Sequence, residues 1–375
     1  MKAVLLSLML LVLCTGCWDM KDINSLAIVS LAGVDKDPKT GELLAYYQVM
    51  NPTGLSTRTG SSAKAAVYTY NFKDFSHGRF TVKTGMSMPR IFFTAHLQSY
   101  IISERYARQG IMDLLNYIEL NPERRANITV YVSDSPLNII MNSFTTLDRV
   151  PGRFIRSLTN HYERNFKNSV YPIRFKDLDK EMNHHTPTII PIIHYNGTKP
   201  SSTSNEVEKI NATQGGMSFH EGAVFIHSRM VGRIDEKSKV LFYILNKNYH
   251  RLTDTITVNG SFVDVEAQRI DVKRTWNADK SQLTINIRAD LRIINNQQQS
   301  KLTLHNSHEM EEAFNRFLEG RAKQLEQLGK DKGWDLLGIQ DNGGRESNWR
   351  QTEVTFHVHS TMKTTGNMST PYLLE

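Results

Sequence analysis

The hydrophobic pattern is most marked at the start of the chain, where residues 3–13 are apolar except for Ser7. This run covers roughly 11 residues, whereas a membrane-spanning helix needs about 20. A lysine precedes the run, and two small residues stand directly before Cys17. A basic residue, a short apolar core and then small residues are typical of a cleavable export signal. Residues 1–16 are therefore predicted to be a signal peptide, cleaved between Gly16 and Cys17.

Cys17 is the predicted site of lipid attachment. It follows Thr-Gly, which fits a peptidase active site, whereas Cys14 follows a bulky Leu-Val-Leu sequence. Lipoprotein signals usually carry Leu, Val or Ile three residues before the modified cysteine, and Cys14 holds that place here. Loss of the signal removes Cys14, so a diacylglycerol thioether on Cys17 would leave no disulfide. Two acyl chains hold a protein on a bilayer, at about 0.8 kcal/mol for each buried methylene. An ordinary secretory signal or a short hydrophobic strand are the alternatives.

Strand and helix patterns alternate in the first half of the chain. A helix is predicted from Ser103, as N-cap, to about Ile118, ending before Asn121-Pro122. The Ser-, Thr- and Gly-rich residues 51–66 predict a loop. Pro191 predicts that the last strand of this half lies at a sheet edge. The segments with the apolar and β-branched content of strands are 26–34, 43–50, 91–93, 99–103, 128–132 and 189–195.

The second half begins after a polar stretch, 200–216, which is predicted to be a linker or long surface loop. A long amphipathic helix is predicted at about 308–328, with Asn306 and Glu309 at capping-box spacing and Gly329 at its end. Its apolar stripe fits either the sheet of its own domain or a partner helix. Strands are predicted at 222–227, 256–265, 283–289 and 352–359.

These elements predict an α+β fold with mainly antiparallel sheets flanked by helices. The N-terminal region, 17–199, is expected to form two subdomains, and 217–375 a C-terminal α+β domain. A mature chain of about 360 residues is long enough for two or three hydrophobic cores.

Charge points to surfaces outside the cell rather than to nucleic acid. The formal net charge is +7, which favours weak attraction to anionic lipid headgroups or cell-wall polymers. The basic residues are scattered along the chain, and the export signal argues against a nucleic-acid partner.

The histidines are the main candidates for chemistry. His184, His185 and His194 are close in sequence, but prolines between them break any helix that would align them, and their spacing is not that of a known metal site. His96 lacks a recognisable catalytic triad around it and is expected to be hydrogen bonded at a strand end. No catalytic residue, metal or cofactor is predicted.

The remaining candidates are weaker still. Gly215-Gly216 and Gly343-Gly344 lack the spaced glycines and the lysine of a nucleotide-binding loop. Arg124-Arg125 could contact lipid headgroups or an acidic partner, or simply be solvated. His357 and His359 share one strand face and are expected to be exposed.

Several short sequences, in a fixed order, resemble those of the Ger(x)C lipoproteins, the C subunits of spore nutrient-germinant receptors. They are Gly16-Cys17-Trp18-Asp19 with Asp22-Ile23-Asn24, then Phe92-Phe93-Thr94-Ala95-His96-Leu97-Gln98, Ile101-Ile102-Ser103-Glu104, Ala107-Arg108-Gln109-Gly110-Ile111 and Pro122-Glu123-Arg124, and finally Glu221-Gly222-Ala223-Val224-Phe225 with Val231-Gly232.

The resemblance implies a three-domain exterior lipoprotein that assembles with two integral-membrane subunits, one of them similar to amino-acid transporters. It would lie on the outer face of the spore inner membrane or cell membrane, anchored through Cys17. The family has no known catalytic residues, so none is transferred. The leading hypothesis is a non-enzymatic scaffold or coupling subunit required for the germination response. A lipid-anchored solute-binding protein of a transporter is the alternative, and a surface hydrolase is a third class.

Overall fold

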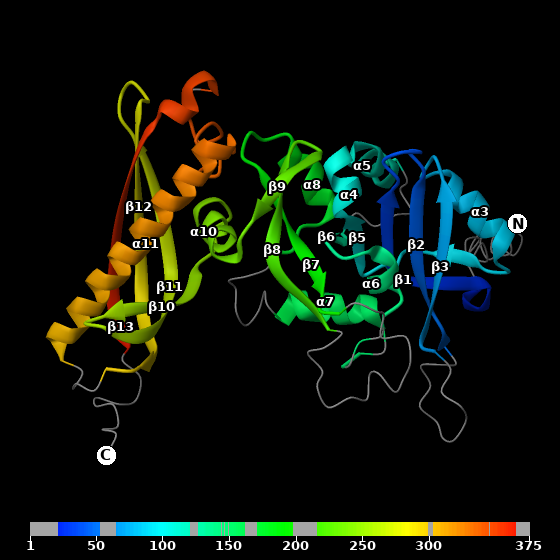
Figure 1. Ribbon diagram of the computed structural model, residues 1–375, viewed down its shortest axis with the longest axis horizontal. Helices are drawn as coiled ribbons and strands as arrows, with labels where there is room; N and C mark the ends of the chain where they lie inside the picture. The colour runs from blue at the N-terminus through cyan, green and yellow to red at the C-terminus, as the bar shows by residue number, and fades with distance from the viewer. Residues whose placement is uncertain are drawn as a thin grey trace, which may run out of the picture.

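The molecule is elongated, with two β-sheets side by side along its long axis and helix α10 (Glu236–Asn246) between them (Figure 1). The computed structural model describes residues 22–52, 65–120, 127–143, 145, 147–148, 150–161, 171–197, 216–298, 303–344 and 346–364. Within these ranges, every helix is too short or too polar to cross a membrane.

The larger sheet is antiparallel at its two edges and parallel at its centre. Its order is β3-β2-β1-β5-β6-β7-β8-β9, and β4 pairs with the start of β1. Because β1, β5, β6 and β7 are parallel, their carboxyl ends meet at one edge of the sheet. The strands are β1 (Leu26–Lys36), β2 (Leu43–Met50), β3 (Val67–Asp74), β4 (Ile91–Phe93), β5 (Ser99–Ser103), β6 (Thr129–Ser133), β7 (Thr188–Tyr195), β8 (Met217–Ile226) and β9 (Arg229–Ile234).

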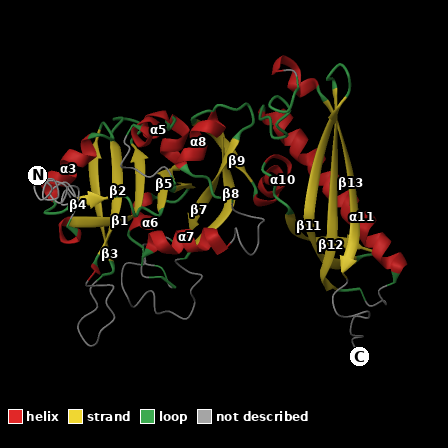
Figure 2. Ribbon diagram, turned by 180° about the vertical axis from the view of Figure 1, so that it is seen from behind, coloured by secondary structure: helices red, strands yellow, loops and turns green. Residues whose placement is uncertain are grey.

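Helices cover both faces of this sheet (Figure 2), which explains why its central strands are apolar on both sides. In β6, Val130 and Val132 face the core beneath α4, α5 and α8, whereas Tyr131 faces the core beneath α6 and α7. Residues of both faces are fully buried. The elements around the sheet are η1 (Ile23–Ser25), α3 (Arg79–Ser87), α4 (Glu104–Gln109), α5 (Met112–Glu119), α6 (Leu137–Met141), α7 (Pro151–His161) and α8 (Phe175–Met182).

The smaller sheet has the order β10-β11-β12-β13, and α11 lies across it (Figure 1). The apolar stripe of α11, including Met310, Phe314, Leu318 and Leu325, is buried in the core of this sheet. The sequence left two packing partners possible for this stripe, the sheet of its own domain or a partner helix. The structure shows that it packs on the sheet of its own domain. The elements are β10 (Arg251–Val258), β11 (Ser261–Trp276), β12 (Gln282–Asn296), β13 (Glu353–Thr364), α11 (Leu304–Lys332) and η3 (Glu346–Gln351).

The prediction of a single strand at 256–265 is wrong, because a tight turn divides this segment between β10 and β11. Asn259 and Gly260 have φ angles of 50° and 78°, and Val258 pairs with Ser261 across them. Asn-Gly with two positive φ angles is the preferred two-residue hairpin turn.

Strand β7 is not the edge strand that Pro191 predicted, since it lies between β6 and β8. The proline is accommodated because β6 pairs only with Ile192 and Ile193, beyond it. On the β8 side, the register shifts directly after Pro191. The backbone N–H that Pro191 lacks is therefore at a position where the hydrogen-bond ladders to β6 and β8 are interrupted.

Two helix limits also differ from prediction. The helix predicted to run from Ser103 to about Ile118 is two helices, α4 and α5, because Gly110 adopts a φ of 109° that interrupts it. Gly329 lies inside α11, which ends instead at Gly333 with a φ of 72°. The capping box of α11 uses Thr303 and Asn306, rather than Asn306 and Glu309.

The predicted fold class is confirmed: the fold combines α-helices with two sheets in which antiparallel pairing predominates. Residues 198–215, which contain most of the predicted linker, lie outside the described residues. The strands on either side of it, β7 and β8, pair with each other from Thr188↔Phe225 to Tyr195↔Met217. The change from one sheet to the other therefore falls at α10, and the predicted domain limits stay predictions.

Candidate functional site

The predicted lipid-attachment residue, Cys17, and the cleavage position at Gly16 lie outside the described residues, so both stay predictions. The first described residue, Asp22, comes five positions after Cys17. Arg124 and Arg125 also lie outside the described ranges. The described structure is therefore that of the folded part of the chain that follows the predicted lipid anchor.

The structure separates the three clustered histidines. The ring of His194, near the end of β7, has Nδ1 3.0 Å from Asp134 Oδ1. At the other end of that strand, His184 Nδ1 is 3.8 Å from Asp341, which also accepts a hydrogen bond from the backbone N–H of His185. Across the described ranges, the acids, histidines and cysteines form no group of three that could hold a metal ion.

The other histidines occupy separate places. His96 is exposed between β4 and β5, with its ring centroid 5.5 Å from that of Phe93. His357 and His359 are exposed on β13, as predicted.

A row of acidic side chains follows the carboxyl ends of the parallel strands. Asp35 stands near the end of β1, Glu104 directly after β5 and Asp134 directly after β6. In open α/β sheets this edge is where ligands most often bind. This edge of the sheet is therefore the first candidate for a functional site.

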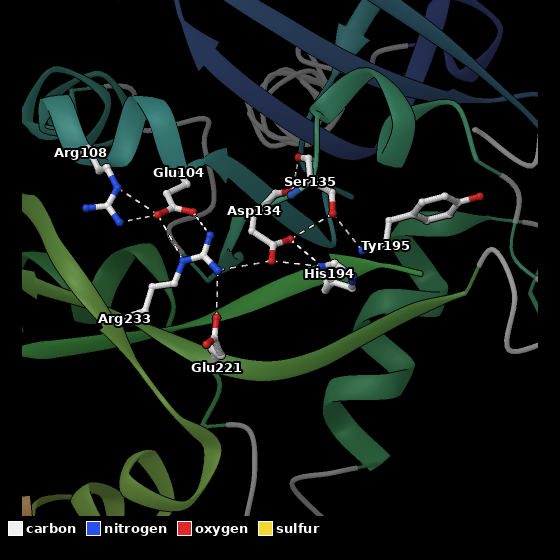
Figure 3. Close-up of polar contacts among 9 residues, drawn as sticks. Glu104, Arg108, Asp134, Ser135, His194, Tyr195, Glu221 and Arg233 are labelled. Carbon is white, nitrogen blue, oxygen red and sulfur yellow. Dashed lines mark hydrogen bonds and ion pairs between the residues drawn. The ribbon is translucent and has the colours of Figure 1, made fainter. Parts of the chain in front are cut away.

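Arg233 of β9 connects two of these acids, Glu104 and Asp134, with Glu221 of β8 (Figure 3). It donates two hydrogen bonds to Glu104, one of them Nε to Oε1 at 3.2 Å. Its Nη1 donates to Glu221 Oε2 at 3.0 Å and lies 3.6 Å from Asp134 Oδ2. Arg108 adds a hydrogen bond from Nε to Glu104 Oε1 at 2.9 Å. One guanidinium therefore joins α4, β6, β8 and β9.

A second chain of hydrogen bonds extends from Asp134 towards β7 (Figure 3). Ser135 Oγ donates to Asp134 Oδ1 at 3.0 Å and accepts from the backbone N–H of Tyr195 at 3.1 Å. His194 Nδ1 is hydrogen bonded to the same carboxylate. This chain ties the connection after β6 to the end of β7, where the two strands share few ladder pairs.

The electrostatics of the Arg233 network favour fixed charges over proton transfer. Burial raises the pKa of Glu104, but the hydrogen bonds from Arg233 and Arg108 outweigh it, so this pKa lies below its ordinary value. The hydrogen bond to Glu104 raises the pKa of Arg233 in turn. A carboxylate this well paired stays ionised at neutral pH and is a poor general acid or base.

Sequence reasoning did not identify this network, because Glu104 and Arg233 are 129 positions apart. The sequence nevertheless contained one indication of these residues. Glu104, Arg108 and Glu221 all belong to the short sequences that carry the family resemblance, and Arg233 directly follows Val231-Gly232.

The two sheets meet through close packing at Gly232 and through polar contacts. A Cβ on Gly232 would lie 2.4 Å from Cη2 of Trp334, which follows α11. Asn246 of α10 donates to the carbonyl of Leu336 at 2.9 Å, and Arg274 of β11 donates to the carbonyl of Leu245 in α10 at 2.8 Å. The C-terminal sheet is therefore attached to β9 and α10 by specific contacts.

An apolar cavity of about 460 Å³ lies at the other end of the first sheet. It is lined by α3, α5, β4 and the adjoining strands, with Phe80, Phe92, Leu97, Tyr100 and Tyr117 among its side chains. Its volume falls in the range of small-molecule sites.

The sequence matches two family models in succession. Residues 19–195 match the spore germination protein N-terminal domain, and residues 220–366 match the spore germination B3/GerAC-like C-terminal domain. The interval between them contains the predicted linker.

Two curated proteins of Bacillus subtilis (strain 168) are similar over part of the chain. Spore germination protein YfkR is 29% identical over 158 residues, which cover 41% of this chain and 40% of that protein. Spore germination protein KC is 25% identical over 196 residues, 51% of this chain and 47% of that protein. The chain thus aligns with less than half of the length of either relative.

Among solved structures, the crystal structure of the GerBC protein is similar in fold. The TM-score is 0.53 at 11% sequence identity, and the alignment covers 88% of this chain and 96% of that one. At this level of identity the likeness shows a shared fold.

Proposed function

This chain belongs to the Ger(x)C family of spore germination proteins, and from this we propose that it is a lipid-anchored, non-enzymatic subunit of a spore nutrient-germinant receptor. The observation that carries the proposal is the match to both family models, which together extend from residue 19 to residue 366. The protein would act on the outer face of the membrane beside two integral-membrane subunits, one of them similar to amino-acid transporters.

The polar network supports a structural role for its charged residues. Glu104 and Arg233 neutralise each other and bind α4 to β9, and Asp134 is held by His194, Ser135 and Arg233. Such paired groups fix the positions of strands rather than activate a nucleophile. The body would therefore serve as a rigid exterior module for its membrane partners.

Membrane attachment through Cys17 is tested by fractionation. The Cys17→Ala variant, expressed without partner subunits, is expected in the soluble fraction. Cys14→Leu is the matched control, since it removes the other cysteine and restores a residue usual at that position of a lipoprotein signal. Membrane attachment of Cys17→Ala, or release of Cys14→Leu, would refute lipidation at Cys17.

Assembly is tested by co-purification with the transporter-like and second membrane subunits expressed together with the wild-type chain. Because folded-domain contacts should add to the anchor, the Cys17→Ala variant is expected to retain weaker co-purification from detergent extracts. If the wild-type chain captures neither membrane subunit, the receptor-subunit proposal fails.

Within the described residues, the apolar cavity is an observation that favours the alternative of a solute-binding protein. Calorimetric titration of the Cys17→Ala chain with amino acids and sugars separates the two functions. A scaffold subunit should give no measurable heat of binding, whereas a solute-binding protein should bind with micromolar affinity. Micromolar binding by the isolated chain would overturn the scaffold role.

A further inference from the structure

Helix α3 presents an apolar face to solvent. Val82 and Met86 are 57% and 82% exposed, and Ile91, at the start of β4, is 65% exposed. Val82 and Met86 are one turn apart and lie opposite Phe80 and Thr84, which are buried against the sheet. Large apolar side chains exposed together on one short segment mark a contact surface.

Basic side chains surround these apolar residues. Residues 73–93 contain four basic residues and one acid, Asp74. Asp74 is buried, with Oδ2 2.9 Å from Lys83 Nζ and 3.3 Å from Arg79 Nε. The segment therefore keeps a net positive charge of three, from its four basic residues less this one acid. An exposed apolar face with a basic border is the composition of segments that lie on anionic bilayers.

The position of this face relative to the predicted anchor favours a lipid bilayer as the surface that it contacts. Ile91 pairs with Leu26 at the very start of β1, and adjacent strands are about 4.8 Å apart. From Cys17 to Asp22 the chain spans at most about 18 Å when fully extended. A lipid on Cys17 therefore brings the start of β1, and β4 beside it, close to the headgroups.

We propose that Val82, Met86 and Ile91, with Lys83 and Arg90 around them, form a membrane-contact surface that lies on an anionic lipid bilayer. The inference rests on the proposed lipid attachment at Cys17. It fixes which end of the elongated body faces the membrane, because α3 and the α11 sheet lie at opposite ends of the molecule (Figure 1).

The test uses the lipidated full-length protein in vesicles of phosphatidylcholine and phosphatidylglycerol. The chain has two cysteines, and processing at Cys17 removes one and acylates the other. A single thiol is then introduced by Met86→Cys or, as control, by Leu304→Cys at the start of α11, where the side chain is 83% exposed. Each is labelled with an environment-sensitive fluorophore.

The label at residue 86 is expected to shift to shorter wavelength and to lose fluorescence to nitroxide quenchers carried on the lipids. The label at residue 304 should keep the emission of a water-exposed probe. If the protein floats with the vesicles but the label at residue 86 keeps the emission of a water-exposed probe, the contact surface is refuted and the lipid anchor is still supported. Failure to float would overturn the anchor and the surface together.

Two further comparisons separate lipid from a protein partner. Arg90→Glu should reduce quenching at residue 86 in the anionic vesicles, whereas vesicles of phosphatidylcholine alone should show little difference between the variants. If the label becomes shielded only when the membrane subunits are present, the face binds protein and the proposal is wrong. If quenching is equal in both vesicle types and both variants, the basic border has no role and the preference for anionic lipid is refuted.

Discussion

Lys239 is a buried cation in α10, and its cost to stability depends on pH. Its side chain is 0% exposed, and Nζ donates to the carbonyl of His220 at 3.0 Å and to that of Glu221 at 3.4 Å. Burial lowers the pKa of Lys239 to about 8, against the smaller opposing influence of nearby acids such as Glu236. The unfolded chain should have the ordinary value near 10.5.

The sign and the size follow from proton linkage. Between pH 8 and pH 10.5 the unfolded state binds more protons than the folded state, so stability rises with pH in this window. Because one pH unit is worth about 1.4 kcal/mol, burial of the charged ammonium costs about 3 kcal/mol below pH 8. About 2.5 kcal/mol of that is regained by pH 10.

The assay is urea unfolding of the Cys17→Ala chain at several pH values from 7 to 10, with and without Lys239→Met. The variant also loses hydrogen bonds to two carbonyls, each worth about 1 kcal/mol, so the diagnostic is the change with pH. Any advantage of Lys239→Met at pH 7 should shrink by about 2.5 kcal/mol at pH 10. Lys237→Met, at an exposed position of the same helix, should follow the parent at every pH. Parallel curves for Lys239→Met and its parent would show that Lys239 keeps its ordinary pKa, and the reasoning would fail.

The remaining predictions concern the network, the junction and the C-terminal core. Arg233→Met should destabilise the fold by about 1–3 kcal/mol in denaturant unfolding at pH 7, because Glu104 is left without its main partner. Since Arg233 lowers the pKa of Glu104, this loss of stability should shrink as the pH falls below the ordinary glutamate value of 4.5, and an unchanged midpoint at pH 7 would contradict the network's role. Gly232→Ala should loosen the contact with Trp334, because the new Cβ would lie 2.4 Å from the indole ring. Fluorescence quenching should then show a more exposed indole, and unaltered quenching would show that the contact relaxes freely. Phe314→Ala should cost about 3–5 kcal/mol in thermal or denaturant unfolding, whereas loss of membrane-subunit binding at unchanged stability would mean that α11 packs on a partner instead.

Local patterns predicted the elements whose environment is simple. β1, β2, β5 and β6 were recognisable because continuous apolar runs of this length, bounded by turn residues, leave few alternatives. α10 was missed for the opposite reason. Its residues from Lys239 to Leu245 are all buried between two sheets, so the helix lacks the polar face by which an amphipathic helix is recognised.

The polar network could not be read from the sequence, since its geometry depends on strand order. Arg233 reaches Glu104 only because β9 follows β8 at the edge of the larger sheet and α4 starts at the end of β5. Glycines show the same limit. Gly329 looked like a helix end, yet it permits the close approach of the Trp334 carbonyl, whose oxygen would lie 2.6 Å from a Cβ at that position.

The pairing of β7 with β8 determines what a break in the polypeptide would do. A cut anywhere between Tyr195 and Met217 falls between the two family-model regions, but it leaves the antiparallel ladder from Thr188 to Tyr195 intact. The two pieces would remain one particle, joined by backbone hydrogen bonds and a shared core. The two regions are thus consecutive in sequence without being detachable in space, and neither carries a complete larger sheet without the other.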